Sequence, residues 1–138
     1  MSVTFIDTSF LLALGSESDA LHARALLWQA HLRGPFVTTE FVLLEVGDAL
    51  TQPEDRSLAC SIIEDLVASV AVEIIPCSPE LLRAGLAFFK SRGDKAWGLI
   101  DCISFHVHDH EILDALSYGH HFEQAGFRAL LRNDPPDN

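Results

Sequence analysis

Apolar residues recur along this chain with two alternating spacings. Short runs rich in β-branched and aromatic residues predict strands, and longer segments with apolar residues three and four apart predict helices. The predicted strands cover residues 3–6, 36–38, 72–75, 112–116 and 127–131. The predicted helices cover residues 18–30, 39–52, 54–69, 80–90, 99–110 and 121–124. The chain therefore alternates strands with helices.

Individual residues mark several of these boundaries. Thr39 is a capping residue at the start of one helix, and Pro79 suits the first turn of another. Strands that alternate with helices predict an α/β fold, here a three-layer α/β/α sandwich with a central, mainly parallel sheet. Ligands of such sheets bind at the carboxyl ends of the strands. Asp7 lies at the end of the first predicted strand.

The length of 138 residues suits one domain. We expect a single domain over residues 1–132 and a frayed tail over residues 133–138. The 49% hydrophobic content excludes a disordered chain. No apolar run approaches the roughly 20 residues of a membrane span, and the N-terminus lacks the features of a signal peptide. Three scattered cysteines predict reduced core thiols in a cytoplasmic protein.

The net charge of −11 arises from 20 acidic and 9 basic residues. Proteins that bind nucleic acid through phosphate contacts alone are normally basic. Any action on a polyanion would therefore need bound cations or a local basic patch.

Three carboxylates interrupt apolar segments. Asp7 ends a strand, Glu45 lies within an apolar helical face, and Asp101 lies near the start of an apolar helix. Burying an unpaired carboxylate costs several kcal/mol. A helix cap or a surface ion pair would explain each one alone. Together they suit a hard cation such as Mg²⁺ or Mn²⁺, which would offset their mutual repulsion.

Four segments, in this order, carry a family resemblance: FIDTSFLLAL, TTEFVLLEVGDAL, RGDKAWGLIDCISF and ALSYGHHFEQAGF. Over nearly its whole length the chain resembles PIN-domain ribonucleases, typified by the toxins of VapBC-type toxin–antitoxin pairs. The resemblance implies an endoribonuclease that depends on Mg²⁺ or Mn²⁺ and cleaves single-stranded or looped RNA. It also implies a homodimer and an antitoxin partner. The antitoxin would insert an apolar helix and a basic side chain toward the acidic pocket of this protein.

The resemblance also assigns individual residues. Asp7, Glu45 and Asp101 match the acidic positions that would bind the metal and support catalysis. Asp94 matches an outer acidic position, and the hydroxyl positions beside the metal correspond to Thr8 or Ser9 and to Ser117. The chain departs at Gly119, where relatives carry a fourth carboxylate. This departure implies a weaker second metal site and a weakened activity.

Lys90, Arg92 and Lys95 form the dense basic cluster of the chain, close to Trp97. These residues are candidates for phosphate contacts, with Trp97 stacked on a base. The alternative is a solvated loop with a partly buried tryptophan.

His106 and His110 have the spacing of a metal pair but lack a third ligand, so we interpret them as helix surface.

Two other classes of function remain open. The first is a non-catalytic PIN-like module that binds RNA or a protein. The second is a receiver-type phosphoacceptor domain, which shares the α/β sandwich and an acidic pocket. Receivers usually have paired acids after the first strand and a lysine after the last. This chain has Asp7 alone and no lysine beyond Lys95, which argues against a receiver.

Overall fold

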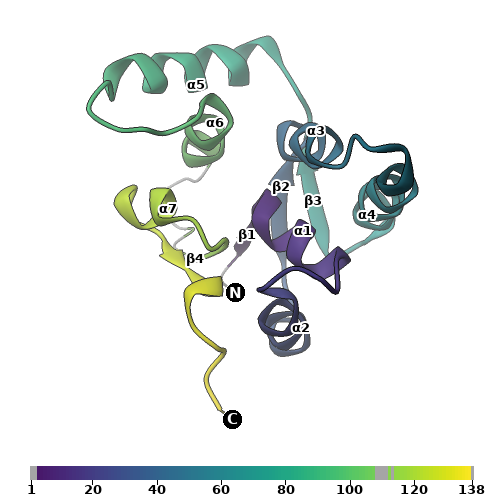
Figure 1. Ribbon diagram of the computed structural model, residues 1–138. Coiled ribbons are helices and arrows are strands. Elements are labelled where there is room, and N and C mark those ends of the chain that lie inside the picture. Colours follow the sequence, from purple (N-terminus) through teal and green to yellow (C-terminus); the bar gives the residue numbers. More distant parts are fainter. Residues whose placement is uncertain (1–2, 108–111, 113, 138) are drawn as a thin grey trace.

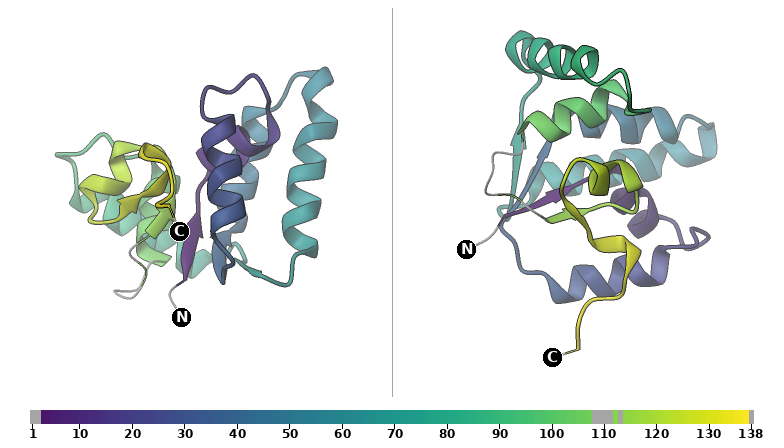
Figure 2. Two further views of the ribbon diagram at one scale, coloured as in Figure 1. Left: turned by 90° about the horizontal axis from the view of Figure 1, so that it is seen from below. Right: turned by 90° about the vertical axis from the view of Figure 1, so that its left-hand side faces the viewer.

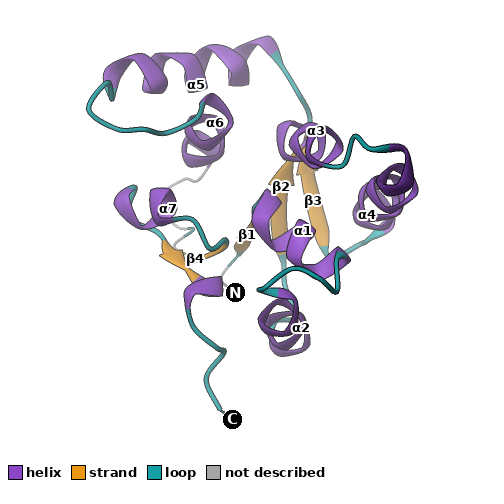
Figure 3. Cartoon of the chain, in the orientation of Figure 1, coloured by secondary structure: helices purple, strands orange, loops and turns teal. Residues whose placement is uncertain are grey.

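A central parallel sheet forms the middle layer of the protein. The computed structural model describes residues 3–107, 112 and 114–137 (Figure 1). The strands are β1 (Thr4–Ile6), β2 (Phe36–Thr39), β3 (Val72–Ile75), β4 (Asp114–Leu116) and β5 (Arg128–Ala129). They lie in the order β3-β2-β1-β4-β5, and every neighbouring pair is parallel. Figure 3 shows β1 to β4 in orange among the purple helices.

Helices cover the sheet on both faces. They are α1 (Thr8–Gly15), α2 (His22–His31), α3 (Glu40–Ala49), α4 (Arg56–Ala68), α5 (Pro79–Ser91), α6 (Leu99–Val107) and α7 (His120–Gln124). The left view of Figure 2 shows α1 to α4 on one side of β1 and α5 to α7 on the other. The predicted α/β/α class with a parallel sheet is confirmed.

The strand order reverses between β1 and β4. The chain builds outward from β1 through β2 to β3, then returns to place β4 on the free side of β1. A crevice at the carboxyl ends of the strands on either side of such a reversal is the usual ligand site of an open parallel sheet. Receiver domains have the order 2-1-3-4-5 instead. The receiver alternative is therefore wrong.

The pattern of apolar residues missed α1. Residues 8–15 are apolar on nearly every side of this helix, so no spacing distinguishes a buried face. The next helix begins at His22 rather than at residue 18, because Asp19 accepts a hydrogen bond from the Leu21 N–H (2.8 Å) and forms a turn there.

Strands β4 and β5 are shorter than predicted, and a 3₁₀ helix over Leu130–Arg132 follows β5. The predicted helix over residues 99–110 ends at Val107 in the described part of the chain. His110 lies outside the described residues.

Aromatic rings fill the core between the sheet and the helices α5 to α7. Phe105 packs edge-to-face on Phe122 (4.9 Å between ring centroids) and on Trp97 (5.1 Å).

The prediction of three core thiols is wrong for Cys60 and Cys77, which are exposed. Cys102 is buried as predicted, and all three thiols are free.

The first residues after position 132 contact α2. Trp28 donates from Nε1 to the carbonyl of Asn133 (2.8 Å), and Arg24 pairs with Asp134 (2.9 Å). These contacts hold the beginning of the expected tail against the domain.

Within the part of the chain that the structure describes, no helix combines the length and the apolar character needed to cross a bilayer.

Gly85 of α5 touches α6 so closely that a side chain does not fit. A β-carbon at this position would lie 2.2 Å from Cγ1 and 3.1 Å from Cα of Ile103, which is 1% exposed. We expect Gly85→Ala to lower the free energy of unfolding by about 2 kcal/mol, because overpacking outweighs the gain in helix propensity. Denaturant titration measures this change.

Gly47→Ala in α3 is the matched control. A β-carbon there meets nothing within 4 Å, so we expect a stabilisation of about 0.5 kcal/mol. Equal stability of the two variants would contradict the close packing of α5 on α6.

Candidate active site

Asp7 lies at the reversal of the strand order. It follows β1 directly and precedes the first turn of α1. Its N–H donates to the carbonyl of Leu116 (3.2 Å), which joins the ends of β1 and β4. The side chain is 9% exposed. The carboxylate is therefore buried at the carboxyl ends of the two central strands.

Two hydroxyl groups orient the Asp7 carboxylate. Ser117 and Ser9 both donate to its Oδ2, at 2.8 Å and 3.1 Å. The Ser9 hydroxyl also accepts from the N–H of Tyr118 (3.2 Å), and the Ser117 hydroxyl accepts from the N–H of Gly119 (3.0 Å). The hydrogen bonds from Ser117 and Ser9 oppose the effect of burial, which raises the pKa of Asp7.

Glu45 reaches the same region from α3. One of its carboxylate oxygens accepts a hydrogen bond from the Thr8 hydroxyl at the start of α1. Partial burial raises the pKa of Glu45, and the negative charges of Asp7 and Asp48 raise it further. The Thr8 hydroxyl opposes both effects. The hydroxyl positions named from sequence therefore touch the predicted carboxylates.

Asp101 lies in the first turn of α6. Its Oδ2 accepts from the N–H of Gly98 (3.1 Å), so it also caps the amino end of this helix. Burial raises the pKa of Asp101, and repulsion from Glu45 adds to the effect. The Gly98 hydrogen bond and the nearby His121 both oppose this rise.

The three carboxylates repel one another, and the nearby His121 opposes this effect at Asp101. Asp101 raises the pKa of Asp7, Asp7 raises that of Glu45, and Glu45 raises that of Asp101. None of the ion pairs among the described residues involves any of the three. A bound divalent cation would satisfy all three charges, so this set of oxygen donors fits Mg²⁺ or Mn²⁺. Among the described side chains, however, no three His, Cys, Asp or Glu residues are already arranged as a metal site.

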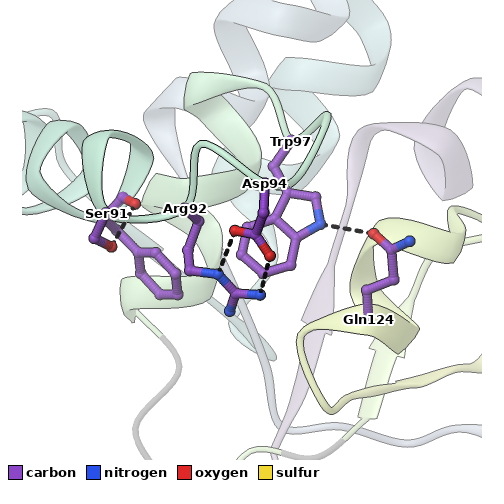
Figure 4. A network of polar contacts seen from close by, with 6 residues as sticks. Ser91, Arg92, Asp94, Trp97 and Gln124 are labelled. Atoms are coloured by element: carbon purple, nitrogen blue, oxygen red, sulfur yellow. Dashed lines mark hydrogen bonds and ion pairs between the residues drawn. The ribbon is translucent and has the colours of Figure 1, made fainter.

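The basic loop after α5 differs from its predicted role in one respect. Trp97 is 4% exposed and donates from Nε1 to Gln124 Oε1 (2.9 Å; Figure 4). Phe88 and Phe105 pack on its ring. The guanidinium of Arg92 lies 4.9 Å from the ring centroid. Trp97 therefore presents no open face to a base. The structure favours the alternative of a loop whose tryptophan is not available for stacking, and Trp97 is buried more completely than that alternative predicted.

Asp94 is exposed and pairs with Arg92 through two contacts of 2.9 Å and 3.1 Å. The Arg92 side chain lowers the pKa of Asp94. This ion pair engages both residues with each other (Figure 4). Lys90 is exposed and Lys95 is partly exposed, so both lysines remain available to a phosphate.

Gly119 immediately precedes α7, beside the acidic residues. Its backbone is extended (φ −67°, ψ 129°), and no side chain caps the helix. A β-carbon there would lie 3.4 Å from the Ser117 hydroxyl, an ordinary contact. The backbone and the space at this position therefore accommodate the carboxylate that the family resemblance predicts there.

His121 is a site residue that the sequence did not identify. Its charge lowers the pKa of Asp101, and its Nδ1 is buried without a hydrogen-bond partner among the described residues. The sequence did offer a signal for this residue, because His121 follows Gly119, the position that lacks the expected carboxylate, by two residues. His106 is exposed on α6, as expected.

A family model described as PIN domain matches residues 4–128. The chain therefore belongs to the PIN domain family. The fold is similar to that of VapC20 from Mycobacterium tuberculosis, whose crystal structure is described as that of a sarcin-ricin loop cleaving toxin. The match has 24% sequence identity and a TM-score of 0.83, and covers 91% of this chain and 97% of the other. No curated protein matches the chain significantly.

Proposed function

We propose that this protein is a metal-dependent endoribonuclease that cleaves single-stranded or looped RNA. The observation that carries the proposal is the mutual repulsion of Asp7, Glu45 and Asp101 at the reversal of the strand order. None of the three forms an ion pair among the described residues. Membership of the PIN family, which includes ribonucleases, supports it. The similar VapC20 structure, described as a loop-cleaving toxin, supports it as well.

Asp7, Glu45 and Asp101 would bind Mg²⁺ or Mn²⁺ through their carboxylate oxygens. A cation bound there would supply an activated water molecule and would stabilise the charge that develops on the phosphate. The protein contributes the orientation of its ligands. Ser117 and Ser9 hold Asp7, Thr8 holds Glu45, and the Gly98 N–H holds Asp101. Such supporting contacts typically change metal affinity or activity by about 10- to 100-fold.

Gly119 favours a second candidate function. Because this position supplies no carboxylate, a second cation would be held less firmly, and the cleavage activity would be weakened. A PIN-like module that binds RNA or a protein without cleaving is the corresponding alternative. The metal-dependent cleavage experiment below distinguishes the two.

A protein partner fits an apolar groove on the opposite side of the sheet from α5 to α7. The groove lies between α1, α2 and α4, and Phe10, Leu14, Leu26 and Ile62 contribute to its lining. Leu26 is 44% exposed. An amphipathic helix of an antitoxin would bury its apolar face there.

A homodimer and a cytoplasmic location remain expectations. Leu82, Leu86 and Phe89 form an exposed apolar face of α5 that is available for self-association.

Asp101→Asn tests the proposed function directly. Asn keeps the oxygen that accepts from the Gly98 N–H but removes the negative charge. We expect cleavage of a single-stranded RNA pool in Mn²⁺ to fall by about 100-fold or more, because one charged metal ligand is lost. Product formation on a denaturing gel measures this loss.

Asp137→Asn is the matched control, since this exposed residue lies in the tail and should leave cleavage unchanged. Equal cleavage by Asp101→Asn and the parent protein would point to a contaminating nuclease. RNA binding without cleavage by either protein would favour the non-catalytic module.

A further inference from the structure

Tyr118 is an exposed aromatic residue anchored beside the acidic site. Its N–H donates to the Ser9 hydroxyl (3.2 Å), and the same hydroxyl donates to Asp7 Oδ2 (3.1 Å). The neighbouring Ser117 is fully buried, whereas Tyr118 is 43% exposed. The backbone of Tyr118 is thus tied to the site while its side chain reaches solvent.

Arg132, which lies 14 residues after Tyr118 in the sequence, contacts both the ring and the backbone of Tyr118. Its guanidinium lies 4.9 Å from the centroid of the Tyr118 ring, and Nη1 donates to the Tyr118 carbonyl (3.0 Å). Nε of Arg132 lies 3.3 Å from Oε1 of Glu123. Arg132 is therefore held by a ring, a carbonyl and a carboxylate. It restrains the ring and places a positive charge close to it.

We propose that Tyr118, supported by Arg132 on one face of its ring, stacks its other face on a nucleobase of RNA. The phosphodiester of this RNA would lie at the cation that Asp7, Glu45 and Asp101 would hold. This inference rests on the proposed ribonuclease function. An ordered ring loses little conformational freedom when a base stacks on it, and its π-face accepts any base. Arg132 adds a positive charge beside the ring, in a chain whose net charge is −11.

The ring of Tyr118 takes the role that the sequence suggested for Trp97. Trp97 is 4% exposed, and its faces are covered by aromatic rings and by Arg92. Stacking makes no hydrogen bond to the edge of the base. The proposal therefore also predicts that the protein accepts any of the four bases beside the cleaved phosphate.

Three variants and a modified RNA test the stacking. Tyr118→Leu removes the ring but keeps apolar surface, whereas Tyr118→Phe keeps the ring. We expect Leu to raise KM for a single-stranded oligonucleotide by about tenfold with little change in kcat, and Phe to resemble the parent protein. Val67→Ala is the control, because Val67 on α4 is an exposed apolar residue outside the proposed site and should leave KM unchanged.

The modified RNA isolates the partner of the ring. An abasic nucleotide beside the cleaved phosphate should raise KM for the parent protein about as much as Tyr118→Leu does. It should change KM of the Leu variant little, because the contact is already lost. Fluorescence quenching of 2-aminopurine at that nucleotide, measured with Asp101→Asn so that the RNA stays intact, reports binding without cleavage.

The outcomes separate this inference from the proposed function. Cleavage by the parent protein with an unchanged KM for Tyr118→Leu would overturn the stacking and leave the ribonuclease intact. Quenching that needs the ring, without any cleavage, would support the stacking and overturn the ribonuclease. Neither cleavage nor quenching would overturn both. A change of oligomeric state in Tyr118→Leu, with RNA binding unaffected, would assign the ring to self-association and overturn the stacking.

Discussion

Replacing Asp7 with Asn will abolish metal-dependent RNA cleavage and will stabilise the metal-free protein. Cleavage should fall by about 100- to 1,000-fold, because the most deeply buried of the three carboxylates is lost. The rise in melting temperature that Mn²⁺ produces in the parent protein should disappear too, because that rise measures binding to the folded state.

The stabilisation of the metal-free form has a separate cause. Asp7 is 9% exposed, has no ion pair in the described structure, and is repelled by Asp101. Two serine hydroxyls offset only part of the cost of its burial. We expect Asp7→Asn to raise the free energy of unfolding at pH 7 by about 1 kcal/mol, measured by denaturant titration in a chelator. A variant that is less stable without metal would show that the carboxylate supports the fold.

The pH dependence of stability follows from the direction of the same pKa shift. Burial and repulsion raise the pKa of Asp7 above its ordinary value of 3.8 in the folded protein. Between that value and the raised one, the folded state binds more protons than the unfolded state. The free energy of unfolding of the metal-free protein therefore falls as pH rises through this window, and Asp7→Asn should flatten the fall.

Gly119→Asp will strengthen metal binding and RNA cleavage. The substitution adds an anionic oxygen ligand at the position where the family resemblance predicts one. We expect the affinity for Mn²⁺ to rise by about tenfold, and the cleavage rate to rise with it if metal occupancy limits the parent protein. Calorimetric titration and a cleavage assay on the same preparation measure the two effects.

The backbone at position 119 imposes no strain on this change. The φ of Gly119 is −67°, so aspartate meets no strain from the left-handed region. Aspartate also suits the position before the first turn of α7, which no side chain caps at present. Repulsion from the other carboxylates opposes this gain. The metal-free variant should therefore stay within about 1 kcal/mol of the parent protein.

Gly119→Asn is the matched control for this prediction. It offers the same cap and nearly the same shape without the negative charge, so it should leave metal affinity nearly unchanged. If Gly119→Asp folds normally and neither metal affinity nor cleavage rises, the match of position 119 to the fourth acidic position of the family is wrong. The assignment of the chain as a weakened nuclease would then be wrong as well.

The three carboxylates were predictable because each interrupts an apolar pattern. Burying a carboxylate costs free energy, so the apolar surroundings of Asp7, Glu45 and Asp101 indicated that these residues have a function. The motifs around them also identified the family. The same approach failed for Trp97, which lies in a polar, basic loop. Its burial depends on Phe88, Phe105 and Gln124, which come from three different helices.

Local spacing was sufficient for most helices and for the parallel sheet, because periodicity and capping are properties of neighbouring residues. It was insufficient for α1, whose apolar residues surround the helix. Tertiary structure alone decided which side chains meet. Ser117 lies 110 positions from Asp7, and their hydrogen bond exists because β4 pairs with β1. The exposure of Tyr118 and the burial of Trp97 have the same origin, since long-range packing determines which side chains reach solvent.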